Sequence, residues 1–300
     1  MAQYIYGLLH GVDEKSRIIA MKDKQKVSFY YMAKGLFQSF MQYFQEGIYV
    51  FLYVSEDTKK YKGYTVKTVV SIEKVLSPNK QNPTVYYDIS IIKSGISSIV
   101  NQPKYKCFLD FEMSMPPYKN YETFISEIIQ VGLVLTDNDG LIIDEVNHFI
   151  QPVLFKDISE RTKRFLSINQ EDINQGITYA EFYSYFQKIL KEYKPMVLVW
   201  GQNDQIELRK MNKIHNLPDY TSKTQFVDLL KLHKTYYGLK NDLGLFNAYN
   251  LYKEVDLTKQ MHNALEDAYV TKEVFFSFRD VCNGLKQVEL NNTIEKANEV

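Results

Sequence analysis

The first third of the chain alternates between apolar and polar residues in short runs separated by turn residues. Alternation of this kind places every second side chain on one face, which is typical of half-buried β-strands. Five strands are predicted, over residues 3–10, 17–21, 26–32, 47–54 and 63–75. Between the third and the fourth, residues 34–44 carry apolar side chains at helical spacing, so one amphipathic helix is expected there.

Three strands, a helix and two more strands follow the order of the OB-fold, a small barrel that often holds single-stranded nucleic acid or sugars. Aromatic side chains share one face of the third or the fourth strand: Phe29, Tyr31, Tyr49, Phe51 and Tyr53. These rings could form a stacking platform for bases, but a place in the core is favoured because aromatic rings bury much apolar area. We expect a small β-rich, OB-like domain over residues 1–78.

A boundary is predicted after this module, because residues 77–83 consist of turn-forming types throughout. Residues 79–104 are interpreted as a connection, with a strand over 84–92 and irregular chain from 93 onward. From residue 105 the pattern changes to strands that alternate with longer helices, which is typical of an α/β domain over residues 105–285. Residues 286–300 are polar and charged and are expected to form a tail.

Composition narrows the class of protein. The most apolar stretch, residues 48–54, is far shorter than the roughly 20 residues that cross a bilayer, and no secretory signal pattern begins the chain. Cys107 and Cys282 alone allow neither a disulfide framework nor a cysteine-based zinc cluster, so a cytoplasmic location is expected.

The formal net charge of zero hides an asymmetry along the chain. Residues 1–104 carry 14 Lys and Arg against 8 Asp and Glu, a net charge of +6, and the remainder carries 22 against 28, a net charge of −6. A basic module therefore precedes an acidic one.

Acidic residues follow two apolar strands of the second domain. Asp110 and Glu112 are two residues apart at the end of a strand over 106–111, so both carboxylates point to one face and can hold a divalent cation. Asp204 follows the strand over 196–200 and a turn that contains Gly201, and it begins a helix over 205–211. Taken alone, Asp204 fits a helix cap as well as a metal ligand.

A third group lies near the end of this domain, where His262 precedes Asp267 by five residues on a loop that enters a helix over 268–278. This spacing can place an imidazole and a carboxylate around one centre. The other four histidines are interpreted as structural: His10, His148, His215 and His233.

Four acids and one histidine in this order resemble the three motifs of the DEDDh (DnaQ-like, RNase T-like) 3′-to-5′ exonuclease superfamily. Asp204 follows Asp110 by 94 residues and precedes Asp267 by 63, as the family implies. Residues 127–132, 167–173 and 226–229 are most similar to the branch that contains the KapD proteins and the enhanced-RNAi-type exoribonucleases. The resemblance covers about residues 105–280 and leaves the amino-terminal module outside it.

The resemblance implies an RNase H-like domain with a mixed central sheet flanked by helices. It also implies two ions, Mg²⁺ or Mn²⁺, held by the four carboxylates, with His262 as the general base. Asp110 would bridge both ions, Glu112 and Asp267 would complete the site of the attacking water, and Asp204 would support the second ion. The expected substrate contacts are Met113, Trp200 and Asn203, although several relatives carry an aromatic residue where Asn203 stands.

The leading interpretation is an exonuclease that releases 5′-mononucleotides from single-stranded 3′ ends, with RNA favoured because the most similar branch acts on RNA. One alternative is a DNA 3′ exonuclease for repair or proofreading. Others are a non-catalytic nucleic-acid-binding protein that uses the exonuclease fold as a platform and a cation-binding structural domain. Protein partners are not predicted by the sequence.

Overall fold

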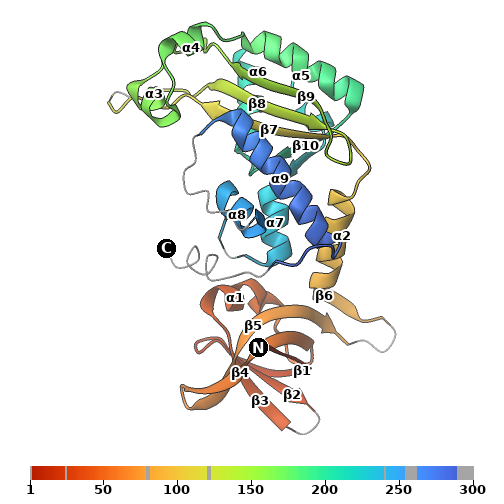
Figure 1. The fold of residues 1–300 in the computed structure, drawn as a ribbon. Helices are drawn as coiled ribbons and strands as arrows, with labels where there is room; N and C mark the ends of the chain where they lie inside the picture. The colour runs from red at the N-terminus through yellow and green to blue at the C-terminus, as the bar shows by residue number, and fades with distance from the viewer. Residues whose placement is uncertain are drawn as a thin grey trace. The chain divides into compact units, whose positions relative to one another are not determined.

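A computed structural model of the chain describes residues 2–23, 26–78, 82–119, 123–239, 241–253 and 262–288 (Figure 1). Contacts divide the chain into two units, Met1–Gly95 and Ile96–Val300, each with a core of its own. Most of the predicted tail, from residue 289 onward, lies outside the described residues. Within them, no helix is both long and apolar enough to cross a membrane.

The first unit is built from strands that close on themselves. The strands are β1 (Ala2–Asp13), β2 (Ile18–Asp23), β3 (Lys26–Tyr31), β4 (Tyr49–Tyr61), β5 (Tyr64–Ser77) and β6 (Thr84–Asp88), with α1 (Lys34–Phe40) and η1 (Met41–Tyr43) between β3 and β4. Neighbouring strands follow the order β3-β2-β1-β4-β5-β6, and β3 also pairs with β5 in parallel. That extra pairing joins the two sides of the sheet into a barrel.

Mostly aliphatic side chains fill this barrel, together with Phe37 and Phe40. Val50, Leu52 and Val54 of β4 are fully buried in its core cluster. The aromatic residues expected in the core, Phe29, Tyr31, Tyr49, Phe51 and Tyr53, are not among the buried residues of that cluster. Because successive side chains of a strand alternate between faces, burial of the aliphatic set turns Phe51 and Tyr53 outward.

The connection predicted over residues 93–104 contains a helix, and the strand expected to run to residue 92 ends at Asp88. The helix, α2 (Ile89–Val100), buries Ile96 and Val100. These two residues and Ile92 recur every four positions, so they share one face of a helix. The serines and Gly95 between them obscured this spacing in the sequence.

The second unit has the predicted mixed α/β fold. Its strands are β7 (Lys106–Met113), β8 (Ile128–Thr136), β9 (Ile142–Phe149), β10 (Met196–Val199) and β11 (Phe226–Asp228). Its helices are α3 (Glu160–Leu166), α4 (Gln170–Asn174), α5 (Tyr179–Tyr193), α6 (Asn203–Ile214), α7 (Leu229–Tyr237), α8 (Leu245–Lys253) and α9 (Ala264–Cys282). The sheet has the order β11-β10-β7-β8-β9, in which β7, β8 and β9 are antiparallel and β10 is parallel to β7 and β11.

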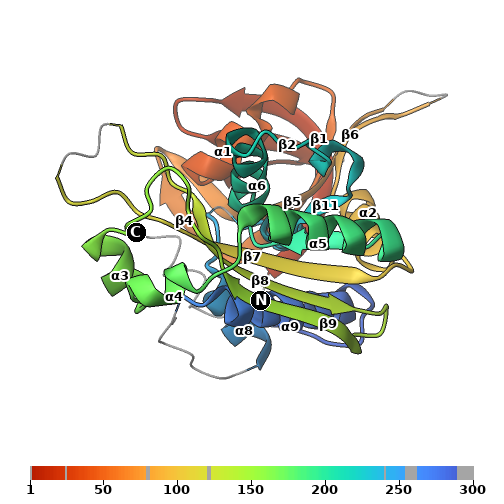
Figure 2. The ribbon, with the colours of Figure 1, turned by 90° about the horizontal axis from the view of Figure 1, so that it is seen from above.

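Helices cover both faces of this sheet (Figures 1 and 2). Leu109 and Phe111 of β7 belong to the core cluster that also contains α5 and α6 side chains. On the other face, Phe108 contacts Phe275 of α9 with ring centroids 5.6 Å apart. Alternation along β7 therefore directs the side chains at 110 and 112 towards the α9 face.

Gly132 of β8 allows α9 to begin directly against the sheet. It is the strand partner of Asp110, and a Cβ atom on it would lie 2.0 Å from the carbonyl carbon and oxygen of Ala264. Real Cβ atoms essentially never come so close to backbone. The absent side chain thus sets how near the first turn of α9 lies to Asp110.

Gly132→Ala is expected to push the first turn of α9 off β8. Overpacking at a rigid backbone contact should lower the free energy of unfolding by about 2 kcal/mol or more, measured by urea denaturation. Gly95→Ala is the matched control, since a Cβ on this helical residue meets nothing within 4 Å. The control should be neutral or stabilise by up to about 1 kcal/mol, and equal losses in both variants would contradict the assignment.

Candidate active site

The strand β7 presents two carboxylates to the α9 face. Asp110 lies opposite Gly132 of β8, and Glu112 lies opposite Gln130. Glu112 is 9% exposed, so it is nearly enclosed although it is an acid. Acids are rarely buried unless they have partners, and these two lie two residues apart with their carboxylates on one face.

The third acid comes from the start of α6. Gly201 adopts a positive φ of 101° in the turn after β10, and Asp204 follows in the first turn of the helix. Asp204 does not cap this helix: Gln202 occupies the N-cap position, and no side-chain cap bond forms. Instead, an Asp204 Oδ1 atom accepts a hydrogen bond from the backbone N–H of Phe111 at 3.2 Å. Phe111 lies between Asp110 and Glu112 in the sequence. Its hydrogen bond therefore holds the Asp204 carboxylate beside the part of β7 that carries both acids.

The fourth acid and the histidine flank the first turn of α9. The side chain of Asn263 caps this helix by accepting from the backbone N–H groups of Leu265 and Glu266. His262 precedes the cap with a positive φ of 47°, a strained conformation for a non-glycine residue, and Asp267 follows in the first turn. The Asn263 cap therefore helps to fix the backbone positions of His262 and Asp267.

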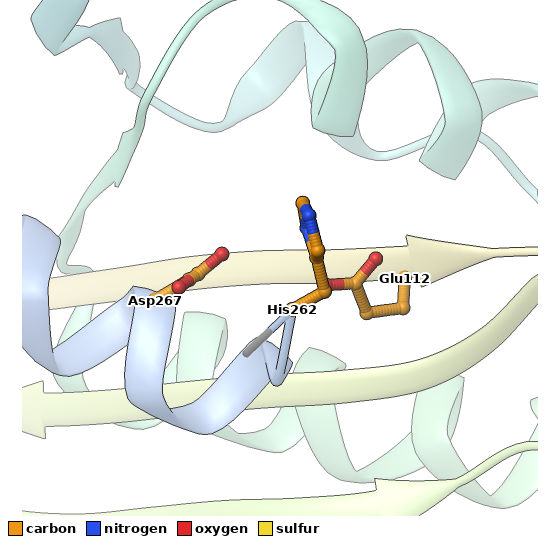
Figure 3. A group of neighbouring side chains, drawn as sticks. All are labelled: Glu112, His262 and Asp267. Atoms are coloured by element: carbon orange, nitrogen blue, oxygen red, sulfur yellow. The ribbon is translucent and has the colours of Figure 1, made fainter. Parts of the chain in front are cut away.

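Glu112, His262 and Asp267 meet in space (Figure 3). One ligand atom from each of the three lies within 4.8 Å of the others. Asp110 and Asp204 belong to the same cluster, because the charges of Asp204 and Asp267 act on Asp110 and the charge of Asp267 acts on Asp204. The structure thus brings together all five residues that the sequence singled out for catalysis.

Burial and mutual repulsion govern the ionisation of this cluster. Burial, together with the charges of Asp204, Asp267 and Glu112, raises the pKa of Asp110 well above its ordinary range. Burial and the charges of Asp267 and Asp204 raise the pKa of Glu112 from 4.5 to about 8. Burial also raises the pKa of Asp204, although the N–H of Phe111 opposes this change.

The donor set suits a hard divalent cation. Carboxylate oxygens are the ligands that Mg²⁺ and Mn²⁺ prefer, and a cation would offset the repulsion that raises these pKa values. His262 adds an imidazole at the edge of the cluster, where a ring nitrogen can accept a hydrogen bond from water. Such an arrangement can activate water next to a phosphate group.

Phe165 of α3 is a neighbour of the site that the sequence did not reveal. Its ring lies over the imidazole of His262, with centroids 4.2 Å apart, and 46% of the residue is exposed. The helix that carries it is tied to the chain after β7, because Ser159 Oγ and Met115 O form a hydrogen bond of 2.8 Å. No local pattern in the sequence distinguishes this ring from other surface aromatics.

Glu127 was likewise not singled out as a functional residue. It is completely buried, and its carboxylate accepts hydrogen bonds from the backbone N–H groups of Val153, Leu154 and Phe155. Its own N–H donates to Ser114 Oγ. Glu127 therefore joins the loop after β9 to the segment that follows Glu112.

The three residues expected to contact substrate differ in their exposure and in their contacts. Met113 packs at the margin of the core cluster, and Asn203 is exposed at the first position of α6. The indole N–H of Trp200 donates to Leu243 O at 3.1 Å, and its ring contacts the buried His233. No feature of these contacts tests the base-stacking role, which stays a prediction.

Comparison with known proteins places this site in a family. A family model described as Exonuclease (RNase_T) matches residues 107–275, more than half of the chain. The chain belongs to the DEDDh 3′-to-5′ exonuclease superfamily. It is accordingly a 3′-to-5′ exonuclease, a hydrolase of phosphodiester bonds, and enzymes of this superfamily depend on divalent metal ions.

The probable 3′-5′ exonuclease KapD of Bacillus subtilis (strain 168) is 27% identical to this exonuclease over 168 residues, which is 56% of the chain and 80% of KapD. The solved nuclease domain of 3′hExo, a DEDDh family member bound to rAMP, matches with a TM-score of 0.52 at 20% identity, over 62% of this chain and 96% of that domain. A 3′-exonuclease solved in a study of histone mRNA stem-loop recognition matches with a TM-score of 0.52 at 19% identity, over 60% and 83% of the two chains. At 20% identity or less, these two solved structures show similarity of fold alone.

Glu112→Gln is expected to change how the stability of the metal-free exonuclease depends on pH. A raised carboxyl pKa means that the folded state retains a proton that the unfolded state has lost between about pH 4.5 and pH 8. The free energy of unfolding should therefore fall across this window in the parent protein, and it should fall less in the variant. Urea denaturation in EDTA at several pH values measures both slopes.

Glu160→Gln is the control, because Lys163 lowers the pKa of the exposed Glu160. This variant should retain the slope of the parent above pH 5. Parallel curves for the parent and Glu112→Gln would show that folding does not raise the pKa of Glu112.

Proposed function

We propose that this exonuclease releases 5′-mononucleotides from the 3′ ends of single-stranded nucleic acid, with RNA preferred over DNA, and that it uses two Mg²⁺ or Mn²⁺ ions. The observation that carries the proposal is the convergence of Asp110, Glu112, Asp204 and Asp267 with His262. Hydrolysis of a phosphodiester needs an activated water and neutralisation of charge on the phosphate. Four acids and one imidazole supply the groups for both.

The four carboxylates would hold the ions, and the ions would lower the pKa of water and neutralise the phosphate when bound. Asp110 lies near the other three acids, so it is suited to share its oxygens. Asp204 is oriented by the Phe111 N–H, and Asp267 by the capped start of α9. These two carboxylates are thus positioned by backbone before substrate arrives.

His262 would accept the proton of the attacking water. One of its ring nitrogens lies within 4.8 Å of ligand atoms of Glu112 and Asp267, so water held by these acids is within its reach. The ring of Phe165 covers one side of the imidazole and limits its rotation. Contacts of the terminal nucleotide with the Met113 backbone, Trp200 and Asn203 complete the proposal.

The preference for RNA follows the relatives. The 3′hExo nuclease domain was solved with rAMP, and a second matching 3′-exonuclease was solved in work on a histone mRNA stem-loop. We carry this substrate class over to the present chain as part of the proposal. The unpaired form of the strand is proposed because the reacting 3′ end must reach a nearly buried set of carboxylates.

We also propose the bounds of the domains. Residues 105–285 would form the catalytic domain, residues 79–104 the connection and residues 286–300 a tail. Residues 1–78 would form an OB-like domain. The barrel closure through β3 and β5, with α1 between β3 and β4, supports that assignment.

Asp204→Ala should reduce Mn²⁺-dependent release of 5′-mononucleotides by about 100-fold or more, because it removes one ligand of the proposed ions. End-labelled single-stranded RNA and DNA of matched sequence measure the rates, and the parent protein should degrade RNA faster. His262→Ala should cause a loss of similar order, roughly 100-fold or more.

Asp242→Asn is the control, since this exposed acid pairs with Lys234 away from the cluster. It should retain the parent rate on both strands. Faster degradation of DNA would favour the repair or proofreading alternative. Activity that survives Asp204→Ala unchanged would refute the assignment of the site.

A further inference from the structure

Two aromatic surfaces lie on the outside of the barrel of residues 1–95, and their electrostatic surroundings differ. One is the basic aromatic face, made by Phe29, Tyr31, Tyr61 and Tyr64 together with Lys59 and Lys62. The other is the tyrosine face, made by Tyr4, Tyr6, Phe51 and Tyr53 on β1 and β4. None of these rings belongs to the buried core of the barrel.

The basic aromatic face consists of two ring pairs that bridge β3 and the β4–β5 hairpin. Phe29 and Tyr64 have centroids 4.8 Å apart, and Tyr31 and Tyr61 have centroids 4.7 Å apart. The parallel pairing of β3 with β5 fixes their spacing along the strands. Such rings are pre-positioned, so little conformational entropy is lost when a flat ligand stacks on them.

Cations surround these rings. Lys59 Nζ lies 4.3 Å from the centre of the Tyr31 ring, and Lys62 Nζ lies 5.8 Å from the centre of the Tyr61 ring. Both lysines are exposed, so their ammonium groups can also reach a ligand. The interaction with the rings holds each charge beside a stacking surface.

Arg17, in the turn between β1 and β2, also contacts the basic aromatic face. Its guanidinium donates from Nη2 to the hydroxyl of Tyr31 at 3.2 Å. Its backbone has a positive φ of 53°, which is strained for arginine. The Nε atom is buried without a hydrogen-bond partner in the described part of the chain. The guanidinium of Arg17 therefore adds a third positive charge to the basic aromatic face.

The tyrosine face has a different character. Tyr4 and Tyr6 are 50% and 60% exposed, and burial together with the charges of Glu73 and Asp88 raises the pKa of Tyr4. Lys74, the cation beside Tyr4, is paired with Asp88 at 2.8 Å. A polyanion would meet acids on this face and ring pairs flanked by lysines on the other.

We propose that the basic aromatic face is a second binding site for single-stranded nucleic acid, distinct from the catalytic carboxylates. The ligand class follows from charge and shape. Bases would stack on the Tyr31–Tyr61 and Phe29–Tyr64 pairs, and phosphates would lie near Lys59, Lys62 and Arg17. The site is independent of sequence, because every base offers a flat face to a ring and no base-specific group is needed.

The experiment measures binding of the full chain to fluorescein-labelled oligouridylate and oligothymidylate in EDTA, where cleavage does not occur. Lys59→Glu with Lys62→Glu should weaken binding roughly tenfold at low salt, and the slope of log K against log salt should become shallower by about 0.7 for each lost phosphate contact. Tyr31→Ala should weaken binding roughly tenfold through lost stacking and leave the salt slope unchanged. Circular dichroism checks that each variant is folded.

Matched variants on other surfaces provide the controls. Lys188→Glu with Lys191→Glu makes the same charge change on exposed positions of α5, and Tyr4→Ser with Tyr6→Ser removes rings from the tyrosine face. Both should bind like the parent in slope and affinity. An unchanged affinity in Lys59→Glu with Lys62→Glu, or an equal loss in either control, would overturn the proposal.

Hydrolysis of a dinucleotide in Mn²⁺ separates this site from the catalytic one, because so short a substrate occupies one site at a time. The variants of the basic aromatic face should hydrolyse it at the parent rate. If the parent itself fails to hydrolyse it, the proposed catalytic function fails while the binding result stands. If the face variants lose this activity, the face is not a separate site.

Discussion

Repulsion among buried carboxylates is the constraint around which the catalytic unit is built. Burial raises the pKa values of Asp110, Glu112 and Asp204, and the charges of neighbouring carboxylates, Asp267 among them, raise them further. Such a cluster costs folding free energy, so rigid backbone has to hold it in place. The Phe111 N–H orients Asp204, the Asn263 cap fixes the start of α9, and Gly132 lets that start lie against β8. A bound cation would offset the cost, which couples ion binding to stability.

The surroundings of the cluster follow from the same requirement for rigidity. The carboxylate of Glu127 accepts hydrogen bonds from three backbone N–H groups. These bonds hold the loop after β9 in place, although this loop has no helix or strand of its own. Phe165 and the His262 ring meet at 4.2 Å because α3 is tied to the chain that leaves β7. The barrel of residues 1–95 keeps the rings of Phe29, Tyr31, Tyr61 and Tyr64 out of its buried core, and this leaves them available for stacking. One chain thus combines a carboxylate site with a basic aromatic surface.

Local periodicity predicted much of this architecture. The sequence predicted β8 and α5 with the bounds that the structure has, because each combines a regular apolar pattern with clear turn residues. It also predicted the five clustered residues, since their order and spacing carry the resemblance to known exonucleases. It missed α2, whose isoleucines are separated by serines, and it favoured the core for Phe51 and Tyr53, which point outward. Phe165 and Glu127 could not be predicted, because their contacts join segments that are distant in sequence.

Anomalous X-ray diffraction from crystals soaked in Mn²⁺ tests whether the four carboxylates hold metal ions together. We expect two anomalous peaks within coordination distance, about 2.0–2.2 Å, of the carboxylate oxygens of Asp110, Glu112, Asp204 and Asp267. The imidazole of His262 should face the space beside them. An absence of peaks at saturating Mn²⁺, or peaks bound by other residues while these carboxylates point apart, would contradict it.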